Sequence, residues 1–375
     1  MKKNALKKLL RHHDPYDHTG TDQWFTEALT ANAAHHATHC ASYEDILKQF
    51  ECDLSTIQTV EDIAQIPPLP TVYFKRHQMH SAPLKKMVIK ATSSGTTSGK
   101  KSMIGMRYKD LYNGFKMIWK LFKYHKLWSL KRVNYFIFGY EPTKHVDLVN
   151  MKSANGFTYV APAKKRIYAM RWDNASGGFK VDLDTMKEGL IKAAKQRHPI
   201  RTIGFPAYTY FLLKAMQEEG IALQMPKGSL VTIGGGWKEF YTEAVDKQAF
   251  YDLVKQVLGI EEKNIIEFFG AVEHPVVMPD CEYHRIHVPV YSRVIIRDPE
   301  TLEPLPKKAV GIINFLSPMN QTTPLTSVMT DDLGILHEGC ECGLKAPWLE
   351  IIGRVGMKDI ATCAQGAETL LNKTR

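Results

Sequence analysis

The sequence predicts an α/β protein with mixed sheets, packed helices and a smaller β-rich subdomain. Short apolar stretches typical of buried strands alternate with longer stretches of helical spacing, which indicates an α/β sheet core. Beyond residue 276 the pattern changes to strands separated by turns, as in Val288–Ile296 and the Asp298-Pro299 turn. With 375 residues, the chain is long enough for two or three core units.

Each expected element follows from its apolar pattern. Residues 1–62 mix polar and apolar residues at helical spacing and are expected to cover one face of the core with helices. The expected strands are 87–91, 134–138, 230–233, 264–269 and 309–315. The expected helices are 106–125, 184–197, 207–219 and 239–258. The predicted domains are residues 1–62 (helical cover), 63–275 (α/β core), 276–352 (β-rich subdomain) and 353–375 (a short C-terminal arm).

Composition and charge narrow the class of protein. The chain is 44% hydrophobic and 23% charged, contains no run of 18 apolar residues, and has no apolar stretch of signal-peptide length after its lysine-rich start. We therefore expect a cytoplasmic protein without a membrane span. The net charge is +10, but the lysines are scattered, so an anionic nucleotide or an acidic partner protein is favoured over nucleic acid. Six cysteines are too few for a disulfide scaffold of this size.

The segment Ala91–Ser102 combines hydroxyls, glycines and two lysines. Glycines let backbone N–H groups turn toward one point, hydroxyls add donors, and Lys100 and Lys101 add charge, so the segment is predicted to hold the phosphates of ATP. A solvated Ser/Gly loop is the alternative. A Walker loop is excluded because only three residues separate Gly95 from Gly99 and Lys101 precedes Ser102. The prolines of Ile66–Pro70 require an extended approach toward this segment.

Three further motifs follow this loop in order: Glu267–Glu273 at the end of a predicted strand, Thr330–Gly334 in a predicted turn, and Ile352–Arg354. The ordered set resembles the motifs of the ANL superfamily of adenylate-forming enzymes. Leu69–Phe74, Ile233–Lys238 and a late cysteine make the chain most similar to the acyl-protein synthetase (LuxE-type) branch, which is related to phenylacetate-CoA ligases. The resemblance covers about residues 60–370 and implies an ANL-type large adenylation domain.

The resemblance also implies roles for individual residues. The residues that would hold the nucleotide are Ser93, Ser94, Gly95, Thr96, Thr97, Gly99, Lys100, Gly234, Gly235, Gly236, Trp237, Phe269, Gly270, Asp332 and Arg354. Glu273 would lie near Mg²⁺ and the phosphates, because Mg²⁺ prefers hard carboxylate oxygens. Asp332 would accept hydrogen bonds from the ribose hydroxyls, with Arg354 assisting. In isolation, each of these acids also fits a surface or capping carboxylate.

The C-terminal region is shorter than that of the larger members of the ANL superfamily. Only 21 residues follow Arg354, so the mobile C-terminal domain and its lysine are expected to be nearly absent, and Met357 stands where the family has a hinge aspartate. Lys358 and Lys373 are open candidates for the missing lysine. In acyl-protein synthetases the acyl acceptor resembles a cysteine near the C-terminus, which here is Cys363. Nine residues of extended chain from Arg354 would span about 30 Å, enough for an arm to reach the adenylate.

Cysteines and histidines also suggest a metal site. Cys281, His287, Cys340 and Cys342 are predicted to hold a structural Zn²⁺, with His284 as a substitute ligand and a pair of reduced cysteines as the alternative. A catalytic metal is not expected, because four protein ligands leave no open position. Five histidines of the N-terminal region have no accompanying pattern of acids or cysteines and are expected at the surface: His12, His13, His35, His36 and His39.

The predicted function is ATP-dependent activation of a carboxylic acid, with a fatty acid favoured, to acyl-AMP. The acyl group would then pass to Cys363 and on to a partner resembling an acyl-CoA reductase. Apolar stretches at 136–140 and 204–213 fit a fatty-acyl or aryl pocket, or simply a core. One alternative is a ligase that uses coenzyme A or a carrier protein as the external thiol. A third is a non-catalytic nucleotide-binding subunit.

Overall fold

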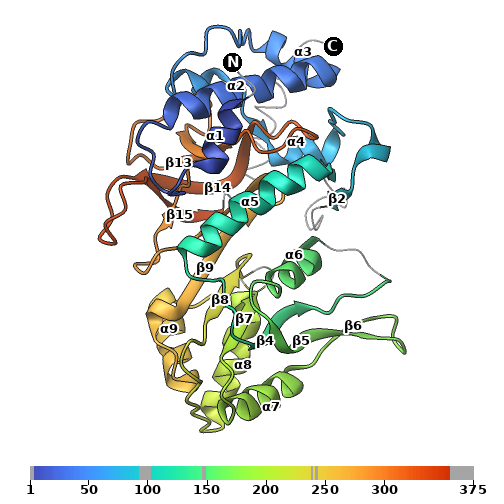
Figure 1. Cartoon of the computed structure of the whole chain (residues 1–375), viewed down its shortest axis with the longest axis vertical. Helices are drawn as coiled ribbons and strands as arrows, with labels where there is room; N and C mark the ends of the chain where they lie inside the picture. Colours follow the sequence, from blue (N-terminus) through green and yellow to red (C-terminus); the bar gives the residue numbers. More distant parts are fainter. Residues whose placement is uncertain (1–3, 93–102, 146–148, 238–239, 241–243, 355–375) are drawn as a thin grey trace. The chain divides into compact units, whose positions relative to one another are not determined.

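The computed structural model divides the chain into two compact units (Figure 1). It describes residues 4–92, 103–145, 149–237, 240 and 244–354. Unit 1 contains the described parts of 1–124, 270–278 and 285–375, and unit 2 contains those of 125–269 and 279–284. The predicted domain boundaries at residues 62, 275 and 352 remain predictions.

Helices form the N-terminal part of unit 1, as its sequence pattern predicts. They are α1 (Ala5–Arg11), α2 (Asp22–His39), α3 (Ala41–Gln49) and the short 3₁₀ helix η2 (Asp62–Gln65). Leu9, Phe25 and Leu29 are fully buried and pack with Ile63 and Leu316 in one apolar cluster. The helices therefore cover a sheet face.

That sheet is mainly antiparallel and has the order β11-β15-β14-β13-β12, with β1 paired in parallel to β14. Its strands are β1 (Leu69–Pro70), β11 (Ile286–His287), β12 (Arg293–Arg297), β13 (Gly311–Leu316), β14 (Ser327–His337) and β15 (Trp348–Arg354). Two buried arginines of β12 fix the helices to it. Arg293 donates to Asp22 Oδ1 at 2.7 Å, and Arg297 donates to the carbonyl of Ala64 at 2.8 Å. The extended Ile66–Pro70 approach is confirmed, since Leu69 and Pro70 form β1.

A hairpin and a long helix complete the N-terminal half of unit 1. The elements are α4 (Thr71–Arg76), the 3₁₀ helix η3 (Leu84–Lys86), β2 (Ile89–Thr92), β3 (Met103–Met106) and α5 (Tyr108–Tyr124). Strands β2 and β3 pair antiparallel. Figure 1 shows α5 as one uninterrupted helix. Strand β10 (His274–Pro279) follows β9 of unit 2 after a two-residue turn and lies almost wholly in unit 1.

Unit 2 is an α/β unit around strand β4. Its sheet has the order β6-β5-β4-β7, and β4 is parallel to both β5 and β7. A parallel bridge joins Arg201 of β7 to Leu230, and β8 pairs in parallel with β9. The strands are β4 (Val133–Tyr140), β5 (Ala163–Asp173), β6 (Gly178–Val181), β7 (Ile200–Gly204), β8 (Val231–Gly234) and β9 (Ile265–Ala271). The helices are α6 (Val149–Phe157), α7 (Leu183–Ala194), α8 (Pro206–Glu218), α9 (Lys247–Leu258) and the 3₁₀ helix η5 (Glu262–Asn264).

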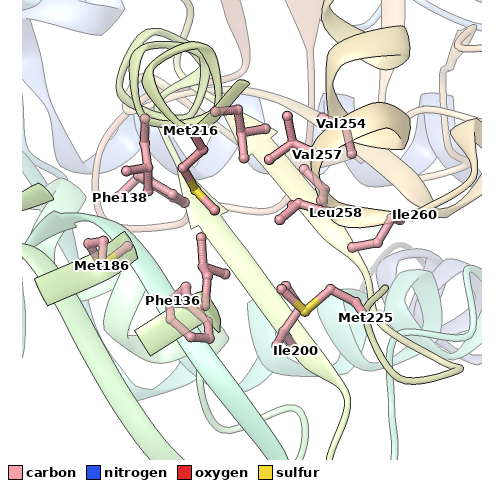
Figure 2. Packing of buried hydrophobic residues seen from close by; sticks show 14 of the residues in the cluster. Phe136, Phe138, Met186, Ile200, Met216, Met225, Val254, Val257, Leu258 and Ile260 are labelled. Carbon is pink, nitrogen blue, oxygen red and sulfur yellow. The ribbon is translucent and has the colours of Figure 1, made fainter. Parts of the chain in front are cut away.

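The core of unit 2 fills the space between this sheet and its helices (Figure 2). Phe136 and Phe138 of β4 pack with Met216 of α8 and Val254 of α9, all nearly inaccessible to solvent. These two phenylalanines belong to the stretch 136–140 that also fits an acyl pocket, and the structure assigns them to the core.

The α/β prediction is confirmed, but two local predictions are wrong. Thr330–Gly334 lies inside β14 rather than in a turn, and its irregularity is a register shift between Leu333 and Gly334. The helix expected over 239–258 begins only at Lys247, because the Asp246 carboxylate accepts a hydrogen bond from the Gln248 N–H and caps the helix there. The Asp and Gly residues of Thr330–Gly334 fit a bulged strand as well as a turn. The apolar spacing over 239–258 does not show where a capping residue begins the helix.

Candidate functional site

The predicted phosphate loop begins and ends on the β2–β3 hairpin. Ser93, Ser94, Gly95, Thr96, Thr97, Gly99 and Lys100 lie outside the described residues. The residues on either side are paired, since Thr92 and Met103 are register partners in the hairpin. The two ends of the segment are therefore held side by side.

Strand β3 is fixed at Gly105 by the segment that follows β13. The Gly105 N–H donates to Thr323 Oγ1 at 2.9 Å, and its carbonyl accepts from the Asn320 side chain at 3.3 Å. A Cβ at Gly105 would lie 2.4 Å from Met87 Sδ and 3.1 Å from Thr322 Cγ2. A side chain at this position would have to displace the Met87 side chain and would crowd Thr322, and the two hydrogen bonds hold β3 against the segment that follows β13.

Asp110 organises the same region from the first turn of α5. One of its carboxylate oxygens accepts from the Gln321 N–H at 2.9 Å, and the other accepts from the Arg107 N–H at 2.9 Å and from the Thr322 hydroxyl. Arg107 in turn donates to Thr322 Oγ1 at 3.1 Å. Asp110 is 6% exposed, so its charge is buried and stabilised by these three donors. Asp110 belongs to no predicted motif, although it is the one acid among the aromatic and apolar residues of α5.

His36 extends the network to α2. It is fully buried, with Nδ1 2.7 Å from Ser81 Oγ and Nε2 3.0 Å from the Asn320 carbonyl. Burial lowers the pKa of His36 to about 3, despite the hydrogen bond to Asn320, so the ring is neutral near pH 7. The expected surface position was wrong for His36, because α2 turns this residue toward the core; His13 and His39 are exposed, and His12 and His35 are partly buried.

The predicted acids and the arginine all lie in unit 1. Glu273 lies in the turn between β9 and β10 and is 6% exposed. Asp332 of β14 and Arg354 of β15 are register partners, so the backbones of these two predicted ribose ligands are neighbours in one strand pair. The Asp332 N–H donates to Thr330 Oγ1 at 3.3 Å, and the neighbouring Asp331 accepts from Thr71 Oγ1 at 3.3 Å.

The other residues predicted to hold the nucleotide lie at or near the ends of the paired strands β8 and β9. Strand β8 ends at Gly234, whose register partner in β9 is Phe268, one residue before Phe269 and two before Gly270. Gly235 and Gly236 have φ values of +83° and +66°, a left-handed turn that glycine adopts without strain. The Trp237 ring lies 5.6 Å from the Tyr210 ring. Parallel pairing thus brings together two motifs that are 30 or more residues apart.

The four predicted zinc ligands form a compact group. One ligand atom each from Cys281, His287, Cys340 and Cys342 lies within 4.8 Å of all the others. Tetrahedral Zn²⁺ would separate such atoms by about 3.5 to 3.8 Å. His287 Nε2 is already 3.3 Å from Cys342 Sγ, and its Nδ1 donates to the Ala346 carbonyl at 3.0 Å. The carbonyl can only accept, so Nε2 carries the lone pair that a metal needs.

The substitute ligand His284 is not part of this group. Its Nδ1 lies 2.7 Å from Asp280 Oδ2, and its ring stacks on Tyr251 with centroids 4.2 Å apart. The remaining predicted catalytic residue, Cys363, lies outside the described residues.

Comparison with known protein families identifies the family of this chain. The family model described as "Acyl-protein synthetase, LuxE" matches residues 5–372. The chain belongs to the LuxE acyl-protein synthetase family. Like its family, it is an AMP-forming ligase that uses ATP to activate a carboxylic acid as an acyl adenylate.

Two curated relatives of this LuxE-family protein match it over most of its length, and a third matches a shorter part. It is 26% identical to the long-chain-fatty-acid–luciferin-component ligase of Aliivibrio fischeri over 317 residues, which cover 83% of this chain and 80% of that one. The protein of the same name from Vibrio harveyi is 26% identical over 329 residues, covering 85% and 82%. Phenylacetate-coenzyme A ligase of Thermus thermophilus is 29% identical over 144 residues, covering 37% and 30%.

Solved structures show the same fold. The structure of a 2-hydroxyisobutyryl-CoA ligase in the postadenylation state, in complex with 2-HIB-AMP, superposes with a TM-score of 0.66 at 13% identity, covering 92% of this chain and 70% of that chain. The same ligase in an open conformation with CoA gives a TM-score of 0.65 at 12% identity, covering 91% and 76%. The ANL-type adenylating fold expected from the motifs is therefore confirmed.

Proposed function

We propose that this protein activates a long-chain fatty acid and transfers the acyl group to its own Cys363. The observation that carries the proposal is the family match over residues 5–372, a range that includes Cys363. The names of the two luciferin-component ligases support a long-chain fatty acid as the substrate. An acyl-CoA reductase-like protein is the partner that would accept the acyl group. We expect the reaction to take place in the cytoplasm.

The proposed chemistry has two steps. A carboxylate oxygen attacks the α-phosphorus of ATP, and the bond to the bridging oxygen breaks to release pyrophosphate. The Cys363 thiolate then attacks the carbonyl carbon of the acyl adenylate, and AMP leaves with the former carboxylate oxygen. The thiol proton goes to solvent or to a basic group. The result is a thioester, whose carbonyl remains open to a second nucleophile or to a reductant.

The predicted site residues would bind the nucleotide for the first step. Lys100 and the loop residues 93–97 would stabilise the charge that builds on the phosphates, and Asp332 with Arg354 would hold the ribose. Glu273 would bind Mg²⁺, which neutralises phosphate charge when present. Its buried carboxylate fits a cation that shares its ligands with phosphate oxygens.

The experiment that tests the proposal separates adenylation from transfer. We expect Cys363→Ser to retain carboxylate-dependent ATP–pyrophosphate exchange and to lose covalent acylation. Cys52→Ser is the matched control, because burial raises the pKa of the Cys52 thiol to about 11 and makes it a poor nucleophile. Covalent acylation that survives in Cys363→Ser would contradict the role of Cys363. Formation of an acyl-CoA thioester without any acylated protein would favour the external-thiol alternative.

We also propose a structural Zn²⁺ at Cys281, His287, Cys340 and Cys342. The geometry of the four donors and the fixed His287 tautomer support it. Cys340 and Cys342 lie in the connection between β14 and β15, the two strands that carry Asp332 and Arg354, so the metal would close that hairpin.

Metal analysis of the purified protein tests the zinc proposal independently of activity. We expect about one Zn²⁺ per chain, lost in Cys342→Ser together with a lower melting temperature, and retained in Cys52→Ser. A wild-type protein without zinc after expression in zinc-supplemented medium would contradict it.

A further inference from the structure

Helix α5 exposes aromatic side chains where a surface helix ordinarily has polar ones. Tyr108, Tyr112, Phe115 and Trp119 are 77%, 58%, 57% and 45% exposed. The side of α5 that is buried includes Asp110 and the polar residue Asn113. The buried side also contains Met117, Leu121 and Phe122, so α5 has an ordinary apolar inner face and, in addition, a set of exposed aromatic rings on its outer face.

The exposed rings form one continuous stripe. Successive residues of an α-helix advance by about 100°, so the spacings of four, three and four residues keep Tyr108, Tyr112, Phe115 and Trp119 within an arc of about 60°. The stripe spans three turns of the helix. Large apolar surface that is contiguous in this way marks a binding surface more often than single exposed residues do.

Positive charge borders the stripe. The same helical geometry places Lys123, Lys116 and Lys109 about 20°, 40° and 60° beyond one edge of the stripe. Lys116 Nζ lies 4.3 Å from the centre of the Tyr112 ring. The hydrogen bond and charge of Lys116, with smaller effects from the charges of Arg11 and Lys7 of α1, hold the pKa of Tyr112 below its usual value.

No exposed carboxylate of α5 or α1 offsets this charge. Asp110 is the one acid in α5 and is buried, and α1 contains none. The two helices are fixed to each other, since Lys120 of α5 donates to the carbonyl of His12 just after α1. We refer to Tyr108, Tyr112, Phe115 and Trp119, with the lysines that border them, as the α5 surface.

The residue types favour a lipid surface over a protein partner. Protein interfaces are enriched in arginine and depleted in lysine, whereas the bordering charges of the α5 surface are lysines. Tyrosine, tryptophan and phenylalanine are the side chains that lie at the boundary between headgroups and acyl chains, and lysines beside them attract anionic headgroups. Among the described residues there is no helix that is long and apolar enough to cross a membrane, so contact through α5 would be peripheral.

We propose that the α5 surface binds the face of a bilayer that contains anionic lipids, with the aromatic rings inserted at the headgroup level. The binding follows from the surface itself. Its consequence for the enzyme rests on the proposed function: a long-chain fatty acid partitions into bilayers, so an enzyme bound there would meet its substrate at high local concentration.

The test is flotation of the full-length protein with vesicles of phosphatidylcholine alone or with one third phosphatidylglycerol, at low and at physiological salt. We expect binding to the anionic vesicles only, weaker at higher salt. Lys109→Glu combined with Lys123→Glu should reduce it by at least about tenfold, because each basic residue near an anionic surface contributes roughly 1 kcal/mol. The matched control combines Lys195→Glu with Lys227→Glu, two exposed lysines of unit 2, and should bind nearly as wild type after the same change in net charge.

A second pair of variants tests the rings. Phe115→Ser with Trp119→Ser should also lose binding, while Tyr283→Ser, which removes a 49%-exposed ring of unit 2, should not. Three results would contradict the proposal. The first is that wild type does not bind anionic vesicles, and the second is that the control lysine variant loses as much vesicle binding as the α5 lysine variant. The third is that the α5 variants bind vesicles as well as wild type does and lose only the binding of a protein partner. Pyrophosphate exchange with a dissolved acid, in the absence of vesicles, measures adenylation separately. The exchange rate should be unchanged in every α5 variant. No exchange in wild type would contradict the proposed function and leave the membrane proposal untouched.

Discussion

Single buried polar residues determine how the β2–β3 hairpin is held. Asp110 satisfies three donors from two separate segments, and Asn320 contacts both Gly105 of β3 and His36 of α2. None of these residues belongs to a motif, and their roles depend on partners more than 200 residues away. Sequence reasoning can find a lone acid in an apolar helix, but it cannot identify the donors around that acid.

We predict that Asp110→Asn destabilises the protein by about 2 to 3 kcal/mol. The amide lacks the charge that strengthens the three hydrogen bonds, and its NH₂ group has no acceptor in place of one donor. Urea unfolding measures the change. Asp184→Asn, at a side chain that is 94% exposed, is the control and should be nearly neutral; equal effects in the two variants would refute the role of Asp110.

Buried neutral histidines predict a dependence of stability on pH. His36 and His274 have folded-state pKa values lowered by burial to about 3, below the usual 6.5 of the unfolded chain. The unfolded state therefore binds protons first, and stability falls as pH decreases below about 6.5 toward 3. At pH 5 each histidine costs about 2 kcal/mol relative to neutral pH.

Urea unfolding of His36→Gln at pH 7 and pH 5 measures this contribution. The variant should be less stable than wild type at pH 7, because two hydrogen bonds change, but it should lose less stability between the two pH values. An identical loss in wild type and variant would show that His36 is not a buried neutral group.

Strand β14 shows why element boundaries near a motif are difficult to predict. Asp and Gly are typical of turns, so Thr330–Gly334 resembles one. In the structure Gly334 lies within the strand. A Cβ at this position would lie 2.6 Å from the Glu350 carbonyl and 2.8 Å from Ile313. The glycine is required by close backbone packing beside a bulge rather than by a turn.

Two glycines of this hairpin form a matched pair of variants. Gly334→Ala should destabilise the protein by about 1 to 3 kcal/mol through overpacking. Gly353→Ala, in the neighbouring strand, has no atom within 4 Å of the added Cβ and should be close to neutral. Thermal unfolding of both variants distinguishes them, and a neutral Gly334→Ala would mean that β14 and β15 are not packed as described.

At the scale of the whole molecule, the order of motifs was sufficient to predict the fold and the family. The alternation of strands and helices predicts α/β structure, and the LuxE match with the adenylating-fold structures confirms the resemblance. The order of strands could not be predicted, because pairings such as β1 with β14 join residues about 260 positions apart. The location of an exposed aromatic stripe on α5 also depends on knowing which face of the helix is buried.

Transfer of the acyl group to Cys363 is the central claim about this protein. Intact-protein mass spectrometry after incubation with Mg-ATP and a mixture of fatty and aryl acids tests it most directly, on wild type, Cys363→Ser and Cys52→Ser. We predict a hydroxylamine-sensitive acyl adduct on wild type and on Cys52→Ser, and none on Cys363→Ser. Release of pyrophosphate without an adduct on any of the three proteins would contradict self-acylation and identify an external thiol as the acceptor.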